Sequence, residues 1–252
     1  MLAQFSGLLL LLALLVPLLL LQRTLHGEMQ AVFLLISRDP VVTIWLFSLI
    51  FFPGILLHET SHFVTAKVLG VRTGRFSLLP RALPGGKLQL GAVEVAQTDL
   101  VRDSIIGVAP LIAGGLFIAY AAIYHMHLLT LWEFLRAGET RLFSRGLALL
   151  PSYSDFWLWF YLVFVVSSTM LPSESDRHAW RPLGVYAALL LGLALLSGAG
   201  PWMLESLAPT LNNFLKSVSL IFALSVIMHL LLLAPTMLAH RLLTAVTGMD
   251  VR

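Results

Sequence analysis

The chain has 252 residues, of which 58% are hydrophobic and only 12% are charged. A soluble domain carries about 25% charged residues, so this chain has too few to cover a water-soluble fold of its size. The composition therefore excludes soluble, disordered and fibrous classes and favours a polytopic membrane protein. The net charge of +3 comes without a Lys/Arg run, so membrane lipids are expected partners and nucleic acid is not. The absence of cysteine excludes disulfides and thiolate metal sites.

Six apolar stretches approach the length of about 20 residues that a membrane-spanning helix needs. They are Met1–Leu21, Val41–Leu69, Ile105–Tyr124, Phe156–Leu171, Leu183–Leu204 and Ser217–Ala239. The first stretch lacks a basic start and an Ala-x-Ala-like cleavage site, so we expect a retained helix rather than a signal peptide. The sequence thus predicts an all-α polytopic membrane protein with about six transmembrane helices, forming one integral membrane domain over residues 1–252.

The connectors predict two smaller features. Leu128, Leu131, Trp132 and Leu135 recur at helical spacing and indicate an interfacial helix. In the longest connector, Val71–Ser104, apolar residues nearly alternate and Pro84-Gly85-Gly86 is a turn signal. We expect a small membrane-associated β-hairpin there, between helices two and three, pairing Phe76–Leu79 with Leu88–Val95. Its edge would either hold an extended peptide or simply plug the mouth of the bundle.

Lys and Arg residues are slightly more numerous on the side that holds the amino terminus and the 71–104 connector. The positive-inside rule then places both termini and this connector in the cytoplasm. We expect an integral multi-pass protein of the cell (inner) membrane, with its active site toward the cytoplasmic side. The oligomeric state stays open.

The second stretch carries His58-Glu59-Thr60-Ser61-His62, an H-E-x-x-H motif. On a helix, residues i and i+4 lie on one face, so two imidazoles can bind one Zn²⁺ while the glutamate acts as a base. Composition predicts about 0.007 such matches by chance. Ionisable groups at membrane depth are costly and usually functional. The alternative is that both histidines only hydrogen-bond within the bundle.

A catalytic zinc needs a third protein ligand. The candidates are Asp176, Glu174, His178, Glu94, Asp99, Asp103 and His229. The second and fourth stretches end on the same side, and Pro172 breaks the fourth helix so that the chain turns back. We therefore favour Asp176, with Glu174 and His178 as fallbacks. A lone membrane histidine such as His229 is usually a hydrogen-bonding group within the bundle.

These motifs resemble the site-2 protease family of intramembrane zinc metalloproteases over residues 41–180. His58-Glu59-x-x-His62 matches its zinc motif, Gly107 to Gly114 is similar to its Ala-Gly-Pro-containing segment, and Asp176 matches its distal ligand. The sequence departs from the family at Arg177, Ser175, Ser168, Ala109 and the position of Pro172. The resemblance implies a divergent zinc metalloendopeptidase, with His58, His62 and Asp176 as ligands, Glu59 as the base, and transmembrane proteins as substrates.

Two other functions fit the same residues. One is a catalytically inactive metal-binding protein of chaperone-like kind, against which Glu59 argues because a structural site needs no base. The other is a metal or proton transporter, against which the lack of an inverted repeat argues.

Overall fold

The structure is a computed structural model that describes residues 2–82 and 88–249. It is predominantly helical with two short antiparallel strand pairs, as the sequence predicts. The helices are α1 (Ser6–Ser37), α2 (Pro40–Val68), α3 (Leu100–Tyr124), α4 (Leu128–Arg136), α5 (Thr140–Leu149), α6 (Phe156–Thr169), α7 (Trp180–Leu196), α8 (Gly200–Trp202) and α9 (Ala208–Thr247). The strands are β1 (Thr73–Ser77), β2 (Arg81–Ala82), β3 (Leu88–Gln89) and β4 (Ala92–Val95).

Four helical segments in the described residues are long and apolar enough to cross a membrane. They are α1, α2, α3 and the continuous run Gly200–Thr247, in which a π-helical turn joins α8 to α9. The pair Thr140–Ser152 and Phe156–Thr169 meets the same criteria together but is bent by 94°. Helix α7, at 17 residues, is only about 26 Å long, less than the ~30 Å apolar core of a bilayer. The structure therefore supports four or five candidate spans, and six stays a prediction.

Two expected boundaries differ from the structure. The first span does not stop at Leu21 but continues to Ser37, and the Glu28 carboxylate within it lies 2.7 Å from Nδ1 of His240 of α9. The fifth span does not reach Leu204. Its helix ends at Leu196, and Gly198, with a φ of +85°, turns the chain.

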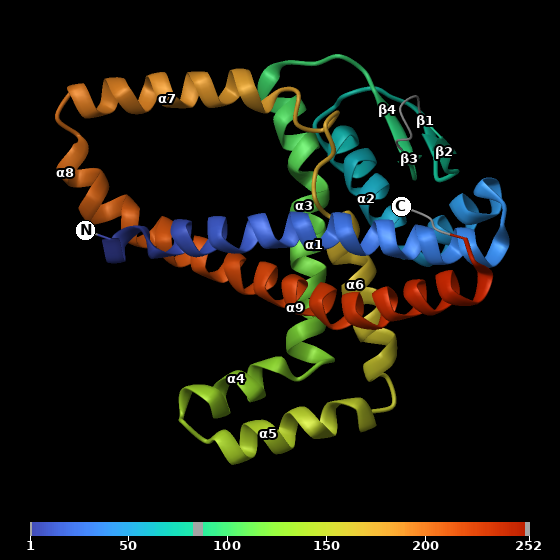
Figure 1. The fold of residues 1–252 in the computed structure, drawn as a ribbon. Coiled ribbons are helices and arrows are strands. Elements are labelled where there is room, and N and C mark those ends of the chain that lie inside the picture. Colours follow the sequence, from blue (N-terminus) through green and yellow to red (C-terminus); the bar gives the residue numbers. More distant parts are fainter. Residues whose placement is uncertain (1, 83–87, 250–252) are drawn as a thin grey trace.

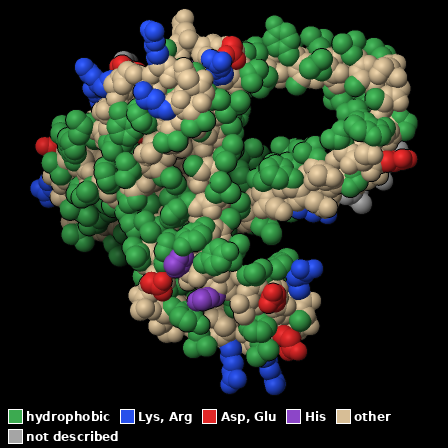
Figure 2. All heavy atoms as spheres, turned by 180° about the vertical axis from the view of Figure 1, so that it is seen from behind, with side chains coloured by type: hydrophobic (Ala, Val, Ile, Leu, Met, Phe, Trp, Pro, Cys, Tyr) green, Lys and Arg blue, Asp and Glu red, His purple; other side chains and the backbone are tan. Residues whose placement is uncertain are grey.

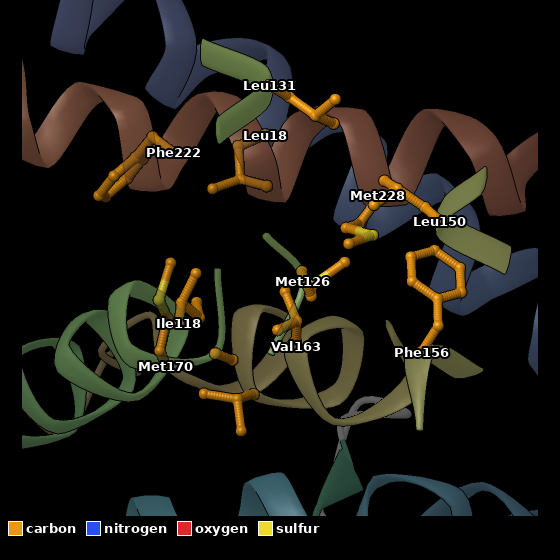
Figure 3. Close-up of a cluster of buried hydrophobic side chains, with 12 residues drawn as sticks. Leu18, Ile118, Met126, Leu131, Leu150, Phe156, Val163, Met170, Phe222 and Met228 are labelled. Carbon is orange, nitrogen blue, oxygen red and sulfur yellow. The ribbon is translucent and has the colours of Figure 1, made fainter. Parts of the chain in front are cut away.

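Helices α1 and α9 lie side by side and run across the group formed by α2, α3 and α6 (Figure 1). They are parallel, because the Gly7 amide donates to Asn212 Oδ1 near both starts, while Glu28 pairs with His240 near both ends. A continuous apolar core joins α1 and α9 to α3 and α6 (Figure 3). It contains the fully buried side chains of Leu18 and Ile118.

Glycines allow the helices of the α2–α3–α6 group to approach closely. A Cβ at Gly54 of α2 would clash with the Val165 carbonyl and the Thr169 hydroxyl of α6. A Cβ at Gly107 of α3 would clash with the backbone carbonyl of Asp176. Small residues at such crossings are the usual device for close helix packing in membranes. Both glycines lie within one or two turns of the candidate site.

The expected hairpin pairing is present in part. Strands β1 and β4 pair antiparallel with Phe76 opposite Val93, but β1 ends at Ser77, and Leu88–Gln89 pair with Arg81–Ala82 rather than with the end of β1. An irregularity between Thr73 and Phe76 shifts the register of β1. The expected turn at Pro84-Gly85-Gly86 lies outside the described residues.

Candidate metal centre

The two histidines of the H-E-x-x-H motif face one another on α2. Their Nε2 atoms are 3.2 Å apart, and both side chains are largely buried. The helix begins at Pro40, where the Asp39 carboxylate caps it by accepting from the Val41 amide, and it continues through the motif to Val68. Local helix geometry alone therefore forms this half of the site.

Backbone carbonyls hold the other nitrogen of each imidazole. Nδ1 of His58 lies 2.6 Å from the Thr169 carbonyl oxygen, and Nδ1 of His62 lies 2.8 Å from that of Ile106. A carbonyl oxygen can only accept, so each Nδ1 carries the hydrogen. In the neutral imidazoles the two Nε2 lone pairs then converge on one point. This outer-shell arrangement is typical of histidines that ligate metals.

Both carbonyls are free for a local reason. The Ile106 carbonyl would normally accept from the amide four residues later, but that residue is Pro110, which has no N–H. Thr169 is the last residue of α6, where helix carbonyls have no intrahelical partner.

Asp176 completes a group of three. Its Oδ1 lies 3.3 Å from Nε2 of His62, and its Oδ2 lies 3.7 Å from Nε2 of His58. Two ligand atoms at ~2.1 Å from one tetrahedral zinc ion lie about 3.4 Å apart, so these separations suit a shared metal. Three acceptor groups that meet without a donor need a cation or an added proton. The donor set of two imidazoles and a carboxylate could therefore hold a metal ion, and Zn²⁺ is one of the ions that such ligands bind.

The loop after α6 orients this carboxylate. The Ser173 amide and hydroxyl donate to Asp176 Oδ2 at 2.7 and 2.6 Å, which leaves Oδ1 turned toward the histidines. Burial raises the pKa of Asp176, but a proton held at His58 or His62 in place of the metal, together with the hydrogen bonds from Ser173, outweighs it and holds the pKa well below its usual range. Asp176 is thus kept ionised, which is the state that a metal ligand requires.

Glu59 lies in the same cavity and is only 7% exposed. A Cβ at Gly91, in the link between β3 and β4, would lie 2.8 Å from its Cγ, so this link passes directly over the Glu59 side chain. The cavity has a volume of about 1060 Å³ and is open to the outside. Residues of α2, of the β3–β4 segment and of the loop after α6 form its walls, and α1 contributes Gln22 and His26.

The other expected ligands lie elsewhere or have other partners. Nε2 of His178 pairs with Asp103 at 2.7 Å, and Glu94 accepts from the Arg75 amide. Glu174 lines the cavity but is not in the group of three. Asp99 caps α3. The pKa of Asp99 is lowered, mainly because its carboxylate accepts a hydrogen bond from the Arg102 amide. His229 is fully buried, with Nε2 3.0 Å from the Ser168 hydroxyl and Nδ1 2.7 Å from the Ser225 carbonyl, as expected for a bundle hydrogen bond.

The contacts by which several residues shape the site were not identified from the sequence. Gly107 and Gly91 admit backbone next to Asp176 and Glu59, and Gln22 donates to the Ser168 carbonyl at the end of α6. Gln22 could have been noticed as a polar residue that follows a long apolar run. The glycines and the carbonyl acceptors carry no such signal, because their role depends on which backbone lies next to them.

Comparisons with family models, with curated proteins and with solved structures found no match to this chain. The functional interpretation of the site therefore depends on the chain's own residues and their geometry.

Proposed function

We propose that the chain is an intramembrane zinc metalloprotease that hydrolyses peptide bonds in or near transmembrane segments of other proteins. One observation carries the proposal. The ligand atoms of His58, His62 and Asp176 converge in a cavity that also holds the buried carboxylate of Glu59, in a chain with four or five candidate spans. A structural metal site would not need a buried carboxylate beside its ligands.

His58, His62 and Asp176 would hold the metal. A bound Zn²⁺ supplies a Lewis acid for the scissile carbonyl and lowers the pKa of water toward ~7. The Glu59 carboxylate accepts a proton from the attacking water and later donates it to the leaving nitrogen. The Nδ1–H groups of His58 and His62 stay bonded to their carbonyls throughout and keep the imidazoles aligned.

The substrate would bind as an extended segment beside β4. Strand β4 pairs with β1 along one edge, and its other edge has no strand partner in the described part of the chain. The segment Gln89–Val95 lines the cavity wall, and Gly91 lies over Glu59. An unpaired edge offers N–H and C=O groups to an incoming strand. A transmembrane segment that unwinds locally would expose its peptide bonds there.

The excess of Lys and Arg near the hairpin supports a cytoplasmic location for this end of the molecule, in a cell membrane. Transmembrane proteins are the substrates that a site between apolar helices favours. A transporter is disfavoured, because the sequence holds no inverted repeat and the described residues form one candidate metal group.

The decisive experiment replaces Glu59 by Gln, which removes the base and keeps the side-chain shape. The reporter is a co-expressed single-span protein whose membrane segment contains helix-weakening Gly and Pro. We expect cleavage to fall by about 10²–10⁴-fold while zinc stays near one ion per chain.

Glu94→Gln is the matched control, because Glu94 also lines the cavity but accepts from the Arg75 amide. It should retain activity and zinc. Unchanged cleavage in Glu59→Gln would refute the mechanism. Zinc binding without cleavage by the unsubstituted chain, whatever the reporter, would favour the inactive metal-binding protein instead.

A further inference from the structure

The helical hairpin α4–α5 lies at the opposite end of α3 from the candidate metal centre (Figure 1). It connects the end of α3 to the start of α6 and meets α6 at a bend of 94°. Ile106, which binds His62, and Tyr124 at the end of α3 are 18 residues apart, or about 27 Å along the helix. That distance is close to the ~30 Å apolar thickness of a bilayer. The hairpin therefore lies about one membrane thickness from the site.

The inner side of the hairpin is fixed to the molecule. Leu131 of α4 and Leu150 after α5 are buried in the core cluster together with Met126 and Phe156 (Figure 3). Gly146 of α5 packs against the Leu131 side chain so closely that a Cβ would have to displace it. The outer side consequently keeps a fixed orientation.

The outer side of α5 is divided into a basic and an apolar half. Arg141 and Arg145 are exposed and lie one turn apart on one face. Leu142 and Leu149 are 43% and 58% exposed and lie on the neighbouring face. Figure 2 shows Lys and Arg side chains projecting away from the molecule at its lower end, where α4 and α5 lie.

Aromatic side chains surround the base of the hairpin. Exposed or half-buried members are Tyr120, Tyr124, Trp132, Tyr153, Trp157 and Trp159. His125 stacks on Trp159 with ring centroids 3.7 Å apart, and it pairs with Asp155 at 3.5 Å. Tyr and Trp gather at the level of lipid headgroups, where one end of the ring is apolar and the other is wet.

We infer that the α4–α5 hairpin is a docking surface for anionic lipid headgroups. Arg141 and Arg145 bind headgroup phosphates, while Leu142 and Leu149 enter the boundary of the acyl chains. Guanidinium groups suit phosphate because they donate in a planar fork. Glu133 and Glu139 keep the net charge of the hairpin small, so the attraction comes from the local arginine pair. This surface is independent of the candidate metal centre and of proteolysis.

The chain has no cysteine, so a fluorophore attached to one introduced cysteine labels that position alone. Ala148→Cys, at an exposed position three residues from Arg145 and outside the proposed contact residues, carries a fluorophore, and the full chain is reconstituted in phosphatidylcholine vesicles. Trace amounts of headgroup-spin-labelled phosphatidylglycerol or phosphatidylcholine serve as quenchers. We expect at least about twofold stronger quenching by the anionic lipid at low salt, decreasing as salt screens the charges.

In the same labelled chain, Arg141→Gln with Arg145→Gln should make the two quenchers equal. The control is Lys216→Gln with Arg241→Gln, which removes two exposed charges from α9 and should leave the preference intact. Equal quenching in the unsubstituted chain would overturn the inference. An equal loss in the control would overturn it as well, because the preference would then come from total charge.

Discussion

A proline and a helix end each free a backbone carbonyl that binds a side chain at the site. Pro110 leaves the Ile106 carbonyl without its helical donor, and His62 binds it. The Ser168 carbonyl lies in the last turn of α6, where helix carbonyls have no helical donor, and Gln22 of α1 binds it. Each of these acceptors lies at membrane depth, where an unsatisfied carbonyl would be costly.

Pro110→Ala should weaken the metal site without removing a ligand. The new amide at position 110 competes with His62 Nδ1 for the Ile106 carbonyl, so the imidazole loses its fixed orientation. We expect zinc affinity to fall by about 10–100-fold, measured by competition with a chelator. Pro17→Ala in α1 is the control, because Pro17 also interrupts a helix but frees no carbonyl that binds a ligand. Equal affinity in both variants would contradict the role of Pro110.

The ligand assignment has its own test. Asp176→Ala should lower zinc occupancy in detergent, because it leaves only two imidazoles. Glu174→Ala should retain zinc, since Glu174 lines the cavity but lies outside the group of three. A loss of zinc in Glu174→Ala, with occupancy retained in Asp176→Ala, would show that the wrong carboxylate was chosen.

Among the individual residues of the site, the sequence predicted those whose proximity depends only on helix spacing. His58 and His62 meet because four residues make about one turn, which no distant contact can alter. Asp176 follows 114 residues after His62, and only a general argument about helix ends favoured it over its neighbours. The carbonyl partners could not be predicted, since nothing in a residue type marks its backbone as an acceptor for a distant side chain.

The helices are brought to the site by close packing at particular glycines. Gly107 lies against the backbone of Asp176, so α3 fixes the depth of the loop after α6. Gly54 does the same for α2 and the end of α6. The elements that carry the three candidate ligands are thus positioned by contacts that leave no room for one methyl group.

Gly107→Ala should displace Asp176 and lower both stability and zinc affinity. Overpacking of this kind costs about 1–3 kcal/mol. Gly115→Ala on the same helix is the control, because its nearest neighbour would be the Ile221 side chain at an ordinary 3.7 Å. Thermal unfolding in detergent and chelator competition measure the two effects. Normal zinc affinity in Gly107→Ala would show that the loop can move without consequence.

The sequence predicted the ends of a span accurately where the helix is about as long as its apolar stretch. Helices α2 and α3 start and end within a few residues of the expected stretches, apart from the five residues that α3 gains at its start. The last expected span, by contrast, is the middle of a much longer helical run. The difference arises because polar residues such as Glu28, Asn212 and His240 bond across the α1–α9 pair and allow both helices to continue.

The parallel pairing of α1 and α9 constrains the topology of the whole molecule. If two parallel helices both cross a membrane, they cross in the same direction. An odd number of crossings must then separate them, and α2, α3 and α6, which α5 enters through the 94° bend, provide three. This arrangement places the two termini on opposite sides, whereas six spans would place both in the cytoplasm.

Single cysteines at Gln4 and Met249 distinguish these topologies, because the natural chain has none. A membrane-impermeant thiol reagent is added to sealed vesicles of one orientation. We expect it to label only one of the two variants until the vesicles are opened with detergent. Labelling of both variants from the same side would support the six-span arrangement and contradict the five-span one.

The sequence by itself determined the membrane class and the histidine pair, because both depend on composition and on the local period of a helix. It also determined the hairpin, whose strands are near neighbours in the chain. The tertiary structure alone decided the position of Asp176, the carbonyls that fix each imidazole, and the parallel α1–α9 pair. These features depend on where segments 44 to more than 200 residues apart come to lie, and tight packing at single glycines sets that placement rather than any local pattern.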